Sequence, residues 1–173
     1  MKSKIMSEIS FYWGVFGVIY ILVKTILNLC IYVNEAFTYA FELHHWITLV
    51  LFTIFMGYSE GYKGFQLKFS PRIISRAIYL KNNLTPVRFV LAPLFCMGYF
   101  YGTKKRLITS YAVTAGVAIL VISVKQLSQP WRGIIDVGVV FGLSWGTLAI
   151  VGFLIQFLKT QKFDVSPETP DQP

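Results

Sequence analysis

Three side chains within hydrophobic stretches of the sequence have the chemistry of acids and bases. His45 and Glu60 lie on one line with Glu42 and Thr53 when residues 36–58 and the turn after them are drawn as a helix. Asp136 is a further carboxylate near the start of the last hydrophobic segment. Imidazole and carboxylate groups are common proton donors and acceptors in enzymes. We therefore take His45, Glu60 and Asp136 as the candidate catalytic residues.

The same residues give little support for a metal site. Glu42 and Glu60 are 18 residues apart, which is about 27 Å along a helix and places the two carboxylates at opposite ends of a membrane span. The two histidines of the chain, His44 and His45, are adjacent and point to different faces. Metal sites usually need three or four ligands. We expect no bound metal and no cofactor.

Charged groups inside hydrophobic segments are expensive and mark functional or paired positions. Lys24 lies about fourteen residues into the first segment, and Asp136 lies one helical turn after Arg132. One hypothesis is a buried pair between Lys24 and Asp136, from the first and last helices. The alternatives are that Lys24 extends to the membrane interface and that Arg132 pairs with Asp136 at the i, i+4 spacing.

The last hydrophobic segment carries the most specific motif of the sequence, a GxxxGxxxG formed by Gly138, Gly142 and Gly146. Glycines four residues apart on one face let another helix backbone approach closely in lipid. The motif predicts helix packing, either within one chain or against a second copy or a partner subunit. Ala112 and Gly116 are the predicted matching surface within the chain.

A basic block between residues 60 and 88 separates two groups of hydrophobic segments. Its cations fit the anionic headgroups of the inner leaflet, and the positive-inside rule places this loop and the N-terminus in the cytoplasm. The candidate headgroup-binding residues are Lys63, Lys68, Arg72, Arg76, Lys81 and Arg88.

Part of this block has the pattern of a short amphipathic helix. Ser70 and Pro71 are a good helix start; the apolar residues that follow fall on one side, and Arg72, Ser75 and Arg76 fall on the other. Such a helix is expected to lie flat among the headgroups. The alternative is a docking surface for a soluble partner.

The elements that carry these residues are predicted to form a helical membrane protein. The chain has 173 residues, of which 55% are hydrophobic and only 14% charged, whereas a soluble domain has roughly 25% charged residues. The net charge of +8 is therefore assigned to lipid contacts, and nucleic acid is not an expected partner. Five hydrophobic segments span about 10–33, 36–58, 86–102, 107–125 and 131–158.

The third segment leaves two topologies open. At 17 residues, with Pro93 in its middle, it is marginal for a crossing, which needs about 20. Five crossings put ten Lys and Arg inside and five outside, whereas a re-entrant third segment puts thirteen inside and two outside. The second count satisfies the positive-inside rule better, but a re-entrant segment needs protein cover. We therefore favour five crossings with a proline kink.

The predicted organisation is one transmembrane domain, 1–158, in the plasma membrane, the inner membrane of a bacterium, followed by a disordered tail, 159–173, with three prolines. No soluble catalytic signature is present in the sequence. The expected function is a non-enzymatic scaffold, assembly or regulatory subunit that contacts a partner or a second copy. The alternatives are a lipid-modifying enzyme acting on an anionic lipid and a small transporter.

Overall fold

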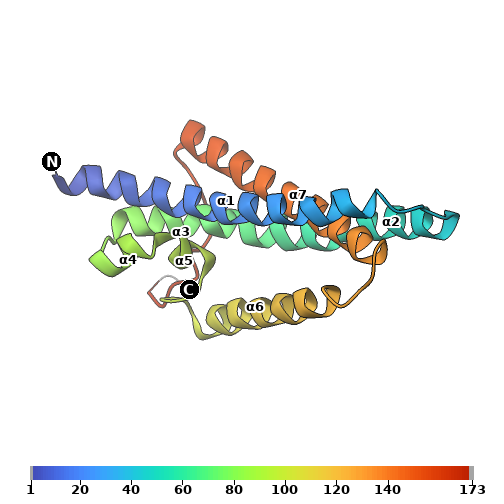
Figure 1. Ribbon diagram of the computed structural model, residues 1–173. Helices are drawn as coiled ribbons and strands as arrows, with labels where there is room; N and C mark the ends of the chain where they lie inside the picture. The colour runs from blue at the N-terminus through green and yellow to red at the C-terminus, as the bar shows by residue number, and fades with distance from the viewer. Residues whose placement is uncertain (1, 172–173) are drawn as a thin grey trace.

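The computed structural model describes residues 2–171, and its elements over that range are all helical. In chain order they are α1 (Lys2–Ala36), α2 (Leu43–Met56), η1 (Gly57–Phe69), α3 (Ser70–Asn82), α4 (Pro86–Val90), α5 (Ala92–Met97), α6 (Lys104–Val124) and α7 (Trp131–Thr160) (Figure 1).

Three helices of the described range are long and apolar enough to cross a membrane. They are α1 from Lys4 onward, with 33 residues, α6 with 21 and α7 with 30. At 1.5 Å per residue each exceeds the roughly 30 Å of a hydrocarbon core. The prediction of an all-helical membrane protein is confirmed at this level, whereas the count of five spans is not.

The basic block predicted as a loop is helical up to Asn82. Elements α2, η1 and α3 follow one another without a break from Leu43 to Asn82, and η1 has π-helical hydrogen bonding over 13 residues. Ser70 has helical dihedrals, with φ −64° and ψ −47°. The α-helix predicted to start at Ser70 does begin there, but it continues the π-helix η1 instead of following a loop.

The glycine face of α7 packs against α2 and η1 of the same chain. An added Cβ would lie 2.6 Å from the Phe52 ring at Gly138 and 2.3 Å from the Phe65 ring at Gly146. The contact is reciprocal, because a Cβ at Gly61 of η1 would lie 3.0 Å from Trp145 of α7. Each of these glycines thus makes room for an aromatic ring on the facing helix.

The third hydrophobic segment, 86–102, is not one kinked helix. It contains α4, with five residues, and α5, with six, and each has a proline in its first turn. Neither can cross a bilayer at 1.5 Å per residue. Two glycines of α1 receive α5: a Cβ at Gly14 would lie 2.7 Å from the Cys96 sulfur, and one at Gly17 would lie 2.3 Å from the Pro93 ring.

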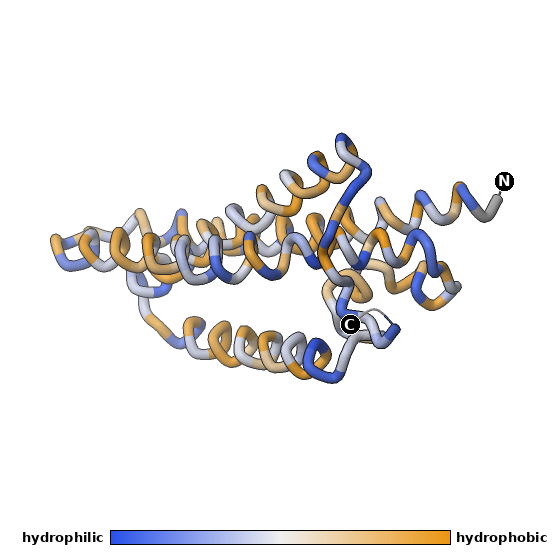
Figure 2. Tube along the Cα trace, turned by 180° about the vertical axis from the view of Figure 1, so that it is seen from behind, coloured by the Kyte–Doolittle hydropathy of each residue, from blue (hydrophilic) through white to orange (hydrophobic). Residues whose placement is uncertain are grey.

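The buried core lies where α1, α3, α5 and α7 meet. Val15, Ile74, Phe95 and Ile150 contribute one fully buried side chain from each of these helices. By contrast, α6 lies beside the bundle with residues 111–123 all exposed, and Figure 2 shows most of this helix in hydrophobic colours. The core therefore holds α3 and α5 against α1 and α7, and no described residue of α6 contributes a side chain to it.

Candidate functional site

Arg76 is the most deeply buried charged residue of the described chain, with 0% of its surface exposed. Its guanidinium donates to the carbonyl oxygens of Phe95 at 2.7 Å, Pro167 at 2.8 Å, Phe100 at 2.9 Å and Tyr101 at 3.2 Å. Its Cζ also lies 4.3 Å from the centroid of the Phe95 ring. Arg76 thereby ties α3 to α5, to the loop after α5 and to the C-terminal tail.

Two other arginines meet the carboxylate of Glu168, which comes from the tail. Arg72 of α3 approaches it with two nitrogens, Nε to Oε2 at 2.8 Å and Nη2 to Oε1 at 3.3 Å. Arg106, in the first turns of α6, places Nε 3.8 Å from Oε2. Both arginines are largely buried, with 17% and 7% of their side chains exposed. We call Arg72, Arg76, Arg106 and Glu168 the arginine cluster.

The position of Arg106 depends on a glycine with positive φ. Gly98 has φ 86°, and an added Cβ there would lie 2.5 Å from Arg106 Nε and 3.1 Å from Ser110 Oγ. Arg106 Nη2 donates to the Met97 carbonyl at 2.9 Å. Its buried Nε has no hydrogen-bond partner among the described residues, because Glu168 lies beyond hydrogen-bond range. The cluster therefore holds an unsatisfied buried donor.

The C-terminal tail lies along α3 and covers the cluster. Ser75 Oγ donates to the Val165 carbonyl, and the Thr103 amide donates to the Glu168 carbonyl at 2.9 Å. Tyr79 donates to Asp171 at 2.6 Å, and this hydrogen bond holds the pKa of Asp171 below its usual value. The tail was predicted to be disordered from its composition, whereas the described part, to residue 171, makes defined contacts.

These contacts also change the interpretation of α3. Nine of its 13 residues are buried, and they include Ser75 and Arg76 from the face that was predicted to be polar and exposed. The expected helix lying flat among headgroups is therefore wrong for this face. The tail and the loop after α5 cover it, which the periodicity of α3 alone could not indicate.

Only part of the predicted headgroup-binding set comes together. Arg72 and Arg76 lie in the cluster. The Arg88 guanidinium of α4 lies 3.9 Å from the centroid of the ring of Tyr101, the residue whose carbonyl oxygen accepts from Arg76. The lysines are elsewhere: Lys81 pairs with Glu8 at 2.6 Å, Lys63 lies over the Tyr58 ring at 4.6 Å, and Lys68 is exposed.

Sequence reasoning missed Arg106 and Glu168 as site residues. The signal for Arg106 was the run Lys104, Lys105, Arg106, in which three cations fall in the first turn of a helix with no acid among them. Cations are unfavourable near the positive end of a helix dipole. Such a run therefore indicates an anion nearby.

The three candidate catalytic residues do not form one site. His45 lies at the start of α2, where its Nδ1 accepts from the Glu42 amide at 3.1 Å and its ring lies 4.8 Å from that of Trp131. Glu60 is exposed on η1, about 22 Å further along the helix. Asp136 is buried on α7. Among residues 2–171, no group of three or more His, Cys, Asp or Glu could hold a metal ion.

The hypothetical pair between Lys24 and Asp136 is absent from the described contacts. Asp136 faces Arg132 at 3.8 Å, and the Arg132 guanidinium lies 3.6 Å from the centroid of the Tyr32 ring of α1. Lys24 is exposed. Asp136 therefore pairs with Arg132 of the same helix, which was the alternative to Lys24.

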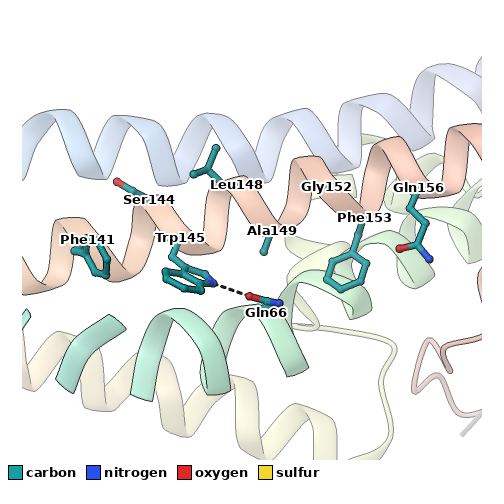
Figure 3. A pocket seen from close by; sticks show the side chains of 9 residues that line it. All are labelled: Gln66, Phe141, Ser144, Trp145, Leu148, Ala149, Gly152, Phe153 and Gln156. Carbon is teal, nitrogen blue, oxygen red and sulfur yellow. Dashed lines mark hydrogen bonds between the residues drawn. The ribbon is translucent and has the colours of Figure 1, made fainter. Parts of the chain in front are cut away.

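An open groove of about 570 Å³ runs between η1 and α7 (Figure 3). Phe141, Trp145 and Phe153 give it an apolar lining, and Trp145 Nε1 donates to Gln66 Oε1 at 2.7 Å beside it. It contains none of the candidate catalytic residues. An apolar groove of this size could receive an acyl chain but has no group for acid–base chemistry.

Comparisons with protein-family models, with curated proteins and with solved structures found no match to this chain. The site must therefore be interpreted from its own geometry.

Proposed function

We propose that this protein is a non-enzymatic membrane subunit, a scaffold or assembly factor, and that α6 is the helix that binds its partner within the membrane. The observation that carries this proposal is the separation of α6 from the bundle. Residues 111–123 are exposed on every side of the helix, and an added Cβ at Gly116 would meet nothing within 4 Å. In lipid an apolar surface alone does not drive helix association, so a specific contact has to come from the small residues of this helix.

The small residues of α6 suit a second helix. Ala112 and Gly116 are four residues apart, which is the spacing of small-xxx-small contacts between membrane helices. The glycine face of α7, their predicted partner within the chain, is already filled by Phe52 and Phe65. The Ala112–Gly116 face is therefore free for a transmembrane helix of another subunit or of a second copy.

The test compares two small-to-large substitutions on α6. Gly116→Leu fills the proposed contact, whereas Ala118→Leu adds a leucine about 200° around the same helix. After cross-linking in native membranes, we expect Gly116→Leu to lower the yield of the cross-linked complex about tenfold, which corresponds to about 1.4 kcal/mol, and Ala118→Leu to leave it unchanged. A complex equally sensitive to both substitutions, or no complex with the wild-type chain, would overturn the proposal.

The enzyme and transporter alternatives receive less support from the geometry. A lipid-modifying enzyme would need His45 or Glu60 beside the arginines, but His45 packs on Trp131, at the start of α7, while the arginine cluster lies at α3 and α5. A transporter using Lys24 and Asp136 would need the two groups along one path, and Lys24 is an exposed side chain whereas Asp136 is buried.

For the topology, we propose four crossings: α1, α2 continued into the first residues of η1, α6 and α7. The rest of η1, α3 and residues 83–103 remain on one side. Of the 16 Lys and Arg, Lys24 lies within α1, Lys125 directly follows α6, and Arg132 is the second residue of α7. The other thirteen are then assigned to the side of the two termini. The positive-inside rule assigns that side to the cytoplasm, and we place the protein in the inner membrane of a bacterium.

A further inference from the structure

The arginine cluster has more positive charge than its surroundings neutralise. Arg72 and Arg106 face one carboxylate, that of Glu168. The Arg76 guanidinium lies beside them, and it donates to the carbonyl oxygen of the adjacent Pro167 rather than to the carboxylate. The amino end of α6 adds its partial positive charge at the same place, because Thr103 is the N-cap and its amide donates to the Glu168 carbonyl. Like charges this close repel one another in a buried site. The cluster is therefore short of negative charge.

The donors of Arg72 and Arg106 are arranged around the Glu168 carboxylate. Arg72 meets its two oxygens with two nitrogens, at 2.8 and 3.3 Å, which is the forked geometry that arginine makes with carboxylates and phosphates. Arg106 Nε is buried and lacks a hydrogen-bond partner within residues 2–171, at 3.8 Å from the same carboxylate. A carboxylate has two oxygens and one charge, so it leaves this donor unsatisfied. A phosphate group offers at least one more oxygen and up to two charges.

We propose that Arg72 and Arg106 form a binding site for a phosphate group, and that the Glu168 side chain occupies this site as an internal substitute when no phosphate is bound. Arg76 is not part of the exchange, because its donors already bind four carbonyl oxygens. The phosphate belongs either to a lipid headgroup or to a free anion, since both present the same oxygens. This inference does not depend on the role of α6.

The attachment of the tail makes the exchange reversible. Arg76 holds the Pro167 carbonyl and the Thr103 amide holds the Glu168 carbonyl, so the backbone stays in place while one side chain leaves. A tethered carboxylate competes at a high effective concentration. The wild-type chain should therefore bind phosphate weakly, and removal of the carboxylate should strengthen binding.

The first test removes only the competing side chain. Glu168 has φ 50°, a conformation that glycine adopts without strain, so Glu168→Gly keeps the backbone contacts. By calorimetry on the full chain in an uncharged detergent, we expect this variant to bind inorganic phosphate or dihexanoylphosphatidic acid about tenfold more tightly than the wild type. The control is Asp164→Gly, which removes an exposed tail carboxylate and should bind like the wild type.

The second test removes the receiving donors in the Glu168→Gly background. Arg106→Gln should abolish the gain, whereas Lys105→Gln removes the same charge from the exposed neighbouring position and should retain it. If Arg106→Gln fails to fold, as judged by gel filtration and circular dichroism, Arg72→Lys replaces it. This variant keeps the charge but loses the fork and should weaken binding.

The ligand arms identify the source of the phosphate. Binding of inorganic phosphate indicates a free anion, binding of phosphatidic acid alone indicates a headgroup, and dihexanoylphosphatidylcholine controls for binding through the acyl chains. The proposal is overturned if Glu168→Gly binds both anions no more tightly than Asp164→Gly does. It is also overturned if loss of Arg106 or of the Arg72 fork leaves the gain intact.

Discussion

At the scale of single residues, Arg76 shows how a buried cation can hold a fold together. Removing a guanidinium from water is costly, and here four carbonyl oxygens and the face of the Phe95 ring offset that cost. The acceptors come from α5, from the loop that follows it and from the tail. Arg76 is therefore the residue on which the mutual placement of these three segments depends.

We predict that Arg76→Met destabilises the protein by about 3–5 kcal/mol, because it leaves several buried carbonyl groups without a donor. Lys68→Met removes one positive charge from an exposed position and should change the stability by less than about 0.5 kcal/mol. Unfolding of both variants in mixed detergent and dodecyl sulfate, followed by circular dichroism, gives the comparison. Equal stability of the two variants would show that Arg76 does not hold α5, the loop after it and the tail together.

The residue types of this site were predictable from the sequence, but their surroundings were not. The pattern of α3 placed Arg72 and Arg76 together on one face, and the structure has both in the cluster. The part of their cover that comes from the tail was missed because those residues lie about ninety positions later, in a proline-containing segment whose composition resembles that of disordered chains. Hydrophobic periodicity reports on one helix and contains no information about a distant segment that packs over its polar face.

At the scale of the elements, reciprocal contacts between glycines and aromatic rings join α7 to η1. Gly146 receives the Phe65 ring, and Gly61 receives Trp145. The glycine motif lies in a close helix contact, and its neighbours are α2 and η1 rather than the Ala112–Gly116 face of α6 that was suggested for it. The partner glycines were visible at four-residue spacing in Gly57 and Gly61. Gly57 was placed at the end of the second hydrophobic segment and Gly61 in the basic block, which was taken as a loop between hydrophobic segments.

We predict that Gly146→Ala destabilises the protein by about 1–3 kcal/mol, because the new methyl group would lie 2.3 Å from the Phe65 ring and would force the helices apart. Gly152→Ala is the matched control on the same helix: its Cβ would meet nothing within 4 Å, and alanine favours the helix by about 0.5–1 kcal/mol. The same unfolding assay should therefore move the two midpoints in opposite directions. Parallel shifts would mean that the α7–η1 contact is not tight.

At the scale of the whole molecule, the crossing count depends on the cover that α1 gives to the segment 86–102. Composition was sufficient to predict a helical membrane protein, and α1, α6 and α7 agree with the predicted segments within a few residues apart from the longer amino end of α1. Pro93 suggested a kink in a crossing helix, but it lies in the first turn of α5. Helix α5 packs closely against α1 at Gly14 and Gly17. This contact buries part of the segment in protein, as a re-entrant segment requires.

Four crossings and five crossings predict opposite locations for two segments, so labelling of single introduced cysteines separates them. In a Cys30→Ala background, with Cys96 buried, the variants are Asn83→Cys, Gln126→Cys and Asp164→Cys, at positions that are all exposed in the structure. With four crossings, a membrane-impermeant maleimide should label only the Gln126→Cys variant on intact cells. It should label the other two variants after permeabilisation.

Five crossings predict the reverse for two of the three variants. The Asp164→Cys variant would then be labelled on intact cells and the Gln126→Cys variant would be protected. The Asn83→Cys variant is protected under both topologies and serves as the control for membrane integrity. We expect the pattern of four crossings, because it alone leaves two rather than five basic residues to face the outside.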